Sequence, residues 1–148
     1  MYVREVHVKY RLRRIRGSDP PTEEALKTPA AAAKVFTTLL GREIVEVCGL
    51  ICLSAALEPI AYHELSRGTL NHTLVYPADV YRIALLTQAV AIVIGHNHPS
   101  GHPAPSPDDV ALTRRLADAG RLIGVDVADH IIVTAEGRYF SFKEAVLL

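Results

Sequence analysis

Two histidines separated by one residue, His96 and His98, follow an apolar run at residues 89–94. Because residues i and i+2 of a β-strand face the same side, both imidazoles can point at one place where the strand ends. Asp109 comes eleven residues after His98, and the loop between them is rich in Pro and Gly, so it can return the carboxylate to the histidines. Two imidazoles and one carboxylate with a fourth position open are the ligands of a catalytic zinc site. The spacing therefore predicts a metal centre at His96, His98 and Asp109, and we expect zinc in it.

A hydrolytic zinc site also needs a base that takes a proton from water and returns it to the leaving amine. Glu46 is the candidate, because it is the single charged residue in the apolar segment 45–53 and a buried lone carboxylate is costly unless it is used. Glu43 is the nearby competitor, and a structural ion pair is the alternative role for Glu46. Ser106, one helical turn before Asp109, could cap a helix, donate a hydrogen bond to an oxyanion, or do both.

Simpler explanations exist for several of these histidines. His96 and His98 could be core or surface residues without a metal, and the ligand types alone would also fit non-haem iron. His102 is expected to be a solvated loop residue, although it could contact substrate or alter metal affinity. His130 follows Asp129, which would suit a proton relay, but a structural histidine on a buried strand is the expected role.

The elements that must position these residues can be predicted from periodicity and capping signals. Expected helices cover residues 29–40, capped by Thr28 and closed by Gly41, then 77–88 and about 107–122, capped by Ser106. Expected strands cover residues 45–53, 60–65, 89–95, 125–134 and 138–140, and a capping box at 141–144 predicts a last helical turn. The order α-β-β-α-β-α-β-β predicts a mixed α/β domain in which helices flank a central sheet.

The length of 148 residues suits one domain with a real core. We expect a single domain over residues 1–148, in which residues 1–28 form a basic strand at 6–12 and a linker, and residues 29–148 form the core. Cys48 and Cys52, the two cysteines, share one apolar segment and are expected to be core thiols. The N-terminus is charged and no apolar run approaches the roughly 18 residues of a membrane span, so we expect a cytoplasmic protein with no membrane partner.

The candidate residues resemble a known signature. Glu46-Val47-Cys48-Gly49, His96-Asn97-His98-Pro99 and Ser106-Pro107-Asp108-Asp109 resemble, in this order, the JAMM motif of the JAB/MPN zinc peptidases. Gly68-Thr69-Leu70-Asn71 and Asp129-His130-Ile131-Ile132-Val133 are similar to motifs of the RadC-like branch, and the resemblance covers about residues 29–148. Counted back without a gap from Gly68-Thr69, the position of the family glutamate falls on Glu46 rather than Glu43. Two positions depart from the branch: His102 stands where Asp is usual, and Gln88 where Asn is usual.

This resemblance implies a cytidine-deaminase-like JAB/MPN fold and a zinc-dependent hydrolase of peptide or isopeptide bonds. It implies that His96, His98 and Asp109 bind zinc, that Glu46 is general base and acid, and that Ser106 helps to hold the oxyanion. The expected substrate is a peptide or a ubiquitin-like protein. No long insertion of the kind that grips a ubiquitin-like tag separates Glu46 from His96, so the substrate stays open.

A second function comes from the RadC name, which suggests a DNA-repair accessory protein with a structural or nuclease-like metal site. The basic run at residues 9–16 could bind nucleic acid, be a solvated strand face, or pair with a second copy as a homodimer. The chain has 16 Lys plus Arg and 16 Asp plus Glu, so no overall positive field supports DNA binding. RadC-like proteins often carry an N-terminal helix-hairpin-helix region, whereas in this sequence only the basic strand is expected before the core. A metal-free interaction scaffold is a third possible function. Scaffold members of the superfamily commonly lack the metal ligands, so the complete ligand set in this sequence counts against it.

Overall fold

The computed structural model of the chain describes residues 9, 26–68 and 75–148. The expected basic strand at residues 6–12, the linker and the motif residues 69–71 therefore fall largely or wholly outside the described residues. The elements follow the order α1 (Pro29–Leu40), β1 (Val47–Leu53), β2 (Pro59–Arg67), α2 (Pro77–Leu86), β3 (Ala91–Asn97), α3 (Pro107–Ile123), β4 (Asp126–Val133) and β5 (Tyr139–Ser141). This order confirms the predicted mixed α/β class.

The five strands form one mixed sheet in the order β2-β1-β3-β4-β5. β1 is antiparallel to both of its neighbours, β3 is parallel to β4, and β4 is antiparallel to β5. All seven residues of β1 and of β3 are buried, which explains why both segments are apolar without alternation. β3 is therefore an inner strand of the sheet, and its end carries His96.

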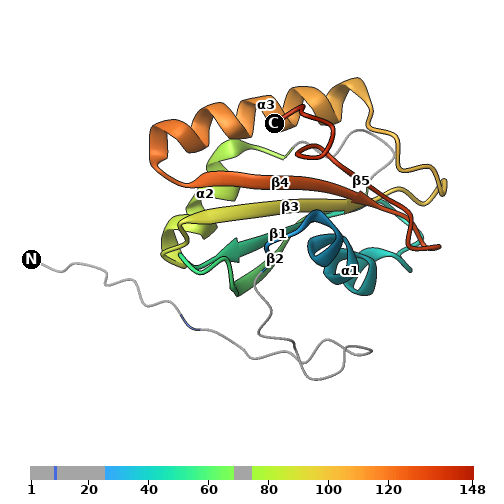
Figure 1. Cartoon of the computed structure of the whole chain (residues 1–148), viewed down its shortest axis with the longest axis horizontal. Helices are drawn as coiled ribbons and strands as arrows, with labels where there is room; N and C mark the ends of the chain where they lie inside the picture. The colour runs from blue at the N-terminus through green and yellow to red at the C-terminus, as the bar shows by residue number, and fades with distance from the viewer. Residues whose placement is uncertain (1–8, 10–25, 69–74) are drawn as a thin grey trace, which may run out of the picture.

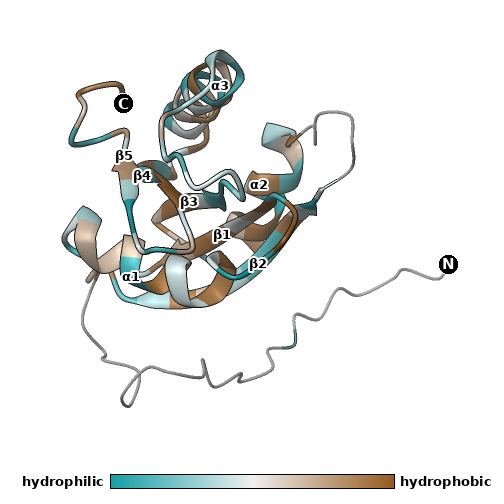
Figure 2. Ribbon diagram, turned by 90° about the vertical axis from the view of Figure 1, so that its right-hand side faces the viewer, coloured by the Kyte–Doolittle hydropathy of each residue, from teal (hydrophilic) through white to brown (hydrophobic). Residues whose placement is uncertain are grey.

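Helices cover both faces of this sheet, with α1 on one side and α2 and α3 on the other (Figure 1). Under α1, Phe36 packs in a cluster with Ile51, Val93 and Ile131. On the opposite face the cluster under α2 and α3 is built from these buried apolar residues: Leu50, Val80, Ile92, Ile94 and Leu116. The apolar strands lie between the helix layers, and α3 turns polar residues outward (Figure 2). Residues 92, 94 and 96 of β3 therefore face the α2 and α3 layer, and the odd-numbered residues face α1.

Gly95 allows α1 to approach the end of β3. A Cβ atom at this position would lie 2.5 Å from the Phe36 ring, so no larger residue fits next to His96 without displacing the helix. The N-terminus of α1 is capped by Thr28, whose side chain accepts a hydrogen bond from the Ala31 N–H at 3.2 Å. The predicted bounds and N-cap of this helix are confirmed, while Gly41 closes it with right-handed helical backbone (φ −59°).

Some boundaries differ from those expected. β3 runs to Asn97 instead of ending at residue 95, so His96 lies inside the strand. α2 ends at Leu86, before Gln88, because Thr87 caps the helix and Gln88 takes a positive φ of 56° that breaks it. The last helical turn predicted at residues 141–144 is confirmed in part. The Ser141 side chain accepts the Glu144 N–H, and the Ser141 carbonyl accepts the Ala145 N–H at 3.1 Å, but the chain continues as a turn and not as a helix. The Glu144 carboxylate faces the Tyr139 hydroxyl (3.4 Å) in place of the reciprocal bond of a capping box.

The environment predicted for Glu46 is also wrong. β1 begins at Val47 rather than residue 45, and Glu46 lies exposed just before the strand. The pairing of β1 with β3 ends at Cys48 opposite His96, so the preceding residues separate from β3, although Val47 still pairs with Arg67 of β2. The argument from a buried lone carboxylate therefore does not hold for Glu46. Among the described residues, no helix combines the length and apolarity that crossing a membrane requires.

Candidate metal centre

His96, His98 and Asp109 converge at the end of β3, as their spacing predicts. His96 Nε2 lies 3.3 Å from Asp109 Oδ1 and 3.0 Å from His98 Nε2, and His98 Nε2 lies 3.8 Å from Asp109 Oδ2. The His96 side chain is 3% exposed, whereas those of His98 and Asp109 are 16% and 13% exposed, so one side of the group stays open to solvent. In the described part of the chain, these three residues form a group that could hold a metal ion.

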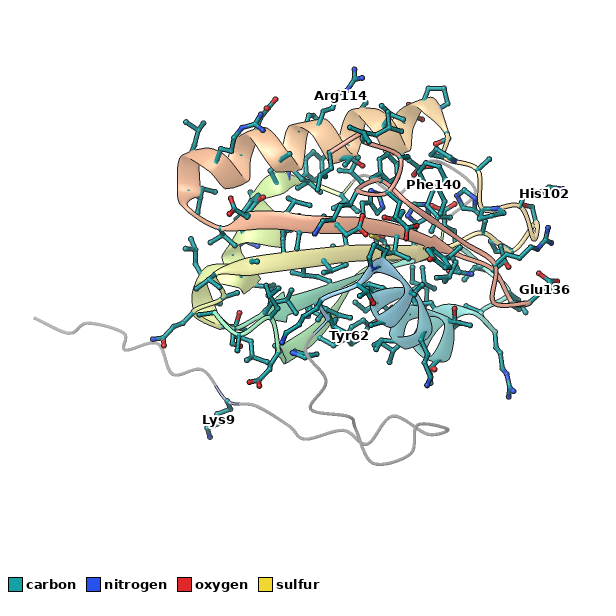
Figure 3. All side chains as sticks on the ribbon, viewed as in Figure 1. Lys9, Tyr62, His102, Arg114, Glu136 and Phe140 are labelled. Atoms are coloured by element: carbon teal, nitrogen blue, oxygen red, sulfur yellow. The ribbon has the colours of Figure 1, made fainter. Side chains whose placement is uncertain are left out.

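The hydrogen bond of His98 determines which of its ring nitrogens faces the group. His98 Nδ1 lies 2.8 Å from the backbone carbonyl of His102, and a carbonyl can only accept, so Nδ1 carries the proton. In neutral His98 the other nitrogen, Nε2, then presents a lone pair to His96 and Asp109. His102 itself is exposed on the loop after β3, as expected, and supplies its backbone rather than its ring (Figure 3).

A chain of three hydrogen bonds fixes His96 in the same way. The Thr113 hydroxyl donates to the Asp109 carbonyl (2.6 Å), so its oxygen accepts from Nδ1–H of His130 (2.6 Å). His130 is completely buried, and burial lowers its pKa well below 6.5, so the ring is neutral and its Nε2 accepts from Nδ1–H of His96 (2.9 Å). His96 Nε2 is consequently unprotonated, and its lone pair is directed at His98 and Asp109. The His130 ring also stacks on Phe142 at 4.8 Å.

The donor set and its spacing fit a zinc ion. Burial lowers the pKa of His96 to about 4, with Asp109 opposing the shift and His98 adding to it, so His96 is neutral at pH 7. Two lone pairs and a carboxylate repel one another unless a cation lies between them. Ligand atoms at about 2.0–2.1 Å from tetrahedral zinc are separated by about 3.3 Å, close to the 3.0, 3.3 and 3.8 Å between these atoms. The three side chains are therefore prepared for a metal before one binds.

Ser106 holds the carboxylate of Asp109 in place. Its backbone N–H and its hydroxyl both donate to Asp109 Oδ2 at 2.7 Å, and its oxygen accepts the Asp109 N–H at 3.2 Å. This capping box begins α3, as the sequence indicates, and leaves Oδ1 directed toward His96. The helix-cap role of Ser106 is thus observed, and a role on an oxyanion stays a prediction.

The two glutamates before β1 have different surroundings. Glu43 accepts hydrogen bonds from Arg67 at 2.6 and 3.3 Å, and this contact lowers the pKa of its carboxyl. Glu46 lies close enough to Cys48 for its charge to contribute to the high pKa of that thiol, about 12, after burial and together with Asp109. Cys48 pairs with His96 across the sheet, so Glu46, two residues before Cys48, lies near the end of β3, whereas Glu43 is held in an ion pair with Arg67. Cys48 and Cys52 are buried free thiols, as expected.

Two residues of this region were given no role by the sequence. Thr113 is completely buried and lies four residues after Asp109 on α3, a spacing that could have indicated its contact with the strand below. Asn97, between the histidines, is 1% exposed. Its Oδ1 accepts the Val47 N–H at 2.7 Å, and its Nδ2 donates to the carbonyls of Val45 (2.9 Å) and Glu43 (3.2 Å). A polar residue inside an otherwise apolar strand was the available signal.

Comparison with known proteins gives a consistent family assignment. A family model described as RadC-like JAB domain matches residues 26–147. A UPF0758 protein of Thermotoga maritima is 46% identical over 105 residues, which cover 71% of this chain and 46% of that protein. A UPF0758 protein of Symbiobacterium thermophilum is 38% identical over 135 residues, which cover 90% of this chain and 57% of that protein. The chain thus spans about half the length of these curated relatives.

Proposed function

The chain belongs to the RadC-like JAB domain family, and from this membership and the geometry of the metal centre we propose that it is a zinc-dependent hydrolase of peptide or isopeptide bonds. The observation that carries the proposal is the convergence of His96 Nε2, His98 Nε2 and the Asp109 carboxylate in an electron-rich group with one open side. Such a group needs a cation, and the open side leaves room for water and substrate.

When bound, a zinc ion supplies a water of lowered pKa and polarises the substrate carbonyl. Glu46 has the chemistry of the base in this scheme, since it is an exposed carboxylate whose charge acts on Cys48, the residue that pairs with His96. It takes the proton of the attacking water and returns it to the leaving amine. Ser106 can donate its hydroxyl hydrogen to the oxyanion if it turns away from Asp109 Oδ2, while its backbone N–H keeps its bond to that carboxylate.

The proposed substrate is a peptide or a ubiquitin-like protein, which fits an open site at the surface. The DNA-related alternative has no structural observation in its favour. Only Lys9 of the basic run at residues 9–16 belongs to the described part of the chain. A cytoplasmic location, a homodimer and any repair partner likewise stay predictions.

Glu46→Gln tests the proposal, with Glu43→Gln as the matched control. The zinc-loaded chain is screened against internally quenched peptides and ubiquitin-like fusions, and each variant is assayed on the substrate found. We expect Glu46→Gln to retain one zinc per chain and to lose about 10²- to 10⁴-fold in kcat, the usual contribution of general acid–base catalysis. Glu43→Gln loses an exposed ion pair and should keep most of the activity. Full activity in Glu46→Gln, or a wild-type chain that binds zinc and cleaves nothing, would count against the proposal.

A further inference from the structure

Asn97 lies on the opposite side of β3 from the metal ligands. Residues 91 and 93 of the same strand pack against the α1 layer, whereas residues 92 and 94 pack against the α2 and α3 layer that His96 also faces. The Asn97 side chain therefore cannot reach the metal group together with His96. It is nonetheless 1% exposed and makes three hydrogen bonds, all to the backbone between Glu43 and Val47.

These hydrogen bonds take the place of the backbone hydrogen bonds between β1 and β3 at the point where the two strands separate. The regular pairing of the two strands ends with Cys48 opposite His96. One residue further on, the Asn97 amide takes the place of a neighbouring backbone: its oxygen accepts the Val47 N–H, and its nitrogen donates to the Val45 and Glu43 carbonyls. The backbone before Cys48, which has separated from β3, is in this way held by one buried side chain of the strand that carries His96.

Glu46 is the residue that this arrangement holds between two fixed neighbours. The N–H of Val47 on one side and the carbonyl of Val45 on the other are bound to Asn97, and the Glu46 carbonyl itself accepts the Gly68 N–H at 2.7 Å. Val47 packs in the α1 cluster and Cys48 in the opposite cluster, and Glu46 lies close enough to Cys48 for its charge to contribute to the raised pKa of that thiol. Asn97 thus holds the backbone on both sides of Glu46, and the charge of Glu46 acts on Cys48, which pairs with His96.

We infer that Asn97 is a positioning residue for Glu46, which ties the segment carrying the base to the strand carrying the metal ligands; this inference rests on the proposed function. The amide is suited to the task because it offers an acceptor to one N–H and two donors to two carbonyls. Aspartate has no donor for the carbonyls of Glu43 and Val45, and serine is too short to span three groups. A fixed backbone narrows the range of positions that the Glu46 carboxylate can take relative to the reacting water.

The test combines Asn97→Ala with Glu46→Gln in a double-mutant cycle on the zinc-loaded full chain. Asn97→Ala should lower kcat on the substrate found in the screen by about 10- to 100-fold, as expected for a misplaced catalytic group, while zinc affinity and KM change by less than about threefold. In the Glu46→Gln background the same substitution should lower the residual kcat by less than about twofold, because a residue that acts through Glu46 has nothing left to position.

Amide hydrogen exchange supplies a readout that does not need activity. Exchange of the Val47 amide and of its neighbours at residues 43–46 should be about tenfold or more faster in Asn97→Ala than in the wild type. Leu53→Ala, at the far end of β1, is the control for general loss of stability. In this variant the amides of residues 43–47 should exchange no faster than its global unfolding allows. Asn97→Ser is the second variant, in case removal of the whole side chain prevents folding.

Three results would overturn the inference: unchanged exchange at residues 43–47, a loss of zinc affinity as large as the loss of kcat, or an equal fall in kcat in the Glu46→Gln background. A zinc-loaded wild type that cleaves nothing would count against the proposed function alone. Exchange of the 43–47 amides would then still decide whether Asn97 holds this segment.

Discussion

Each histidine of the metal centre has its second ring nitrogen occupied, and this decides what the first can do. His98 donates to a backbone carbonyl, and His96 donates to His130, whose own proton goes to Thr113. Both imidazoles are in this way set in the tautomer that leaves Nε2 free for a metal, and neither ring can rotate without breaking a hydrogen bond. The free energy needed to fix the tautomer and the orientation of each ring is spent during folding. It therefore does not reduce the affinity for a metal.

Replacement of His130 should therefore weaken zinc binding although His130 does not touch the ion. His130→Leu removes the acceptor of the His96 Nδ1–H. We expect the zinc dissociation constant to rise by roughly 10- to 100-fold, the usual effect of losing the hydrogen-bond partner of a ligating histidine. His130→Gln keeps an acceptor and a donor and should lose less. The measurement is competition with a chromophoric chelator at pH 7.5.

The control for this prediction is His63→Leu, which removes an exposed histidine on β2 away from the metal group. It should bind zinc as the wild type does. Equal dissociation constants for His130→Leu and the wild type would show that His130 serves packing alone, through its stack on Phe142.

At the scale of elements, β3, the loop after it and the start of α3 form the unit that builds the metal group. β3 supplies His96, the loop supplies His98 and the carbonyl that orients it, and the first turn of α3 supplies Asp109. The capping box joins two functions in this unit, since the bonds that begin the helix also hold the Asp109 carboxylate. The stability of α3 and the shape of the metal group are consequently coupled.

Ser106→Ala and Thr28→Ala separate these two functions, because each removes the side-chain cap of one helix. Both variants should lose about 0.5–2 kcal/mol of unfolding free energy in the zinc-free protein, measured by urea denaturation. Zinc affinity should fall several-fold in Ser106→Ala alone, since the Thr28 hydroxyl caps α1 and has no contact with the metal group. Equal zinc affinity in the two variants would mean that the backbone N–H of Ser106 suffices to hold Asp109.

The sequence predicted most of these elements because their signals are local. Thr28 and Ser106 mark the starts of α1 and α3, and the two apolar runs that become β1 and β3 are buried on both faces. The position of Glu46 could not be predicted in this way. Whether a strand includes its first residues depends on what lies beside it, and here the Asn97 side chain from a distant segment takes the Val47 N–H.

The links around the metal group were hidden for the same reason. His130 and Thr113 lie 34 and 17 residues from their partners in the chain of hydrogen bonds, His96 and His130 respectively. Such contacts follow from the order of strands in the sheet, which places β4 beside β3, and not from any local pattern. The convergence of His96, His98 and Asp109 could be predicted because their motif is compact, whereas the residues that orient them could not.

At the scale of the whole molecule, the metal group sits where parallel neighbours β3 and β4 end, outside the carboxyl edge of the sheet. Side chains from both strands and from α3 meet there, so the core of the sheet extends directly into the hydrogen bonds of the group. His96 of the group and its hydrogen-bond partner His130 are buried, at 2% and 0% exposure. Global stability must therefore depend on the protonation of these rings.

The zinc-free protein should lose stability on acidification between pH 6.5 and about 4. Burial lowers the pKa of His96 to about 4 and that of His130 well below 6.5, so in this range the unfolded chain binds protons that the folded chain excludes. The stabilisation is complete above about pH 6.5 and is lost as the pH falls, with a slope of up to about 1.4 kcal/mol per pH unit for each ring. Asp129, whose pKa burial raises, acts in the opposite sense at the acidic end.

Urea denaturation in the presence of a chelator at pH 7.5, 6.5, 6.0 and 5.0 measures this slope. From pH 6.5 to 5.0 we expect the unfolding free energy to fall by about 2–4 kcal/mol, and His130→Gln, which leaves His96 as the one buried ring of the pair, should roughly halve the fall. With zinc bound the protein should be more stable at pH 7.5 and lose this extra stability as protons displace the metal. A zinc-free stability that is flat or rises on acidification would mean that the buried rings admit protons without unfolding, and that the neutral tautomers of His96 and His130 are not set by the fold.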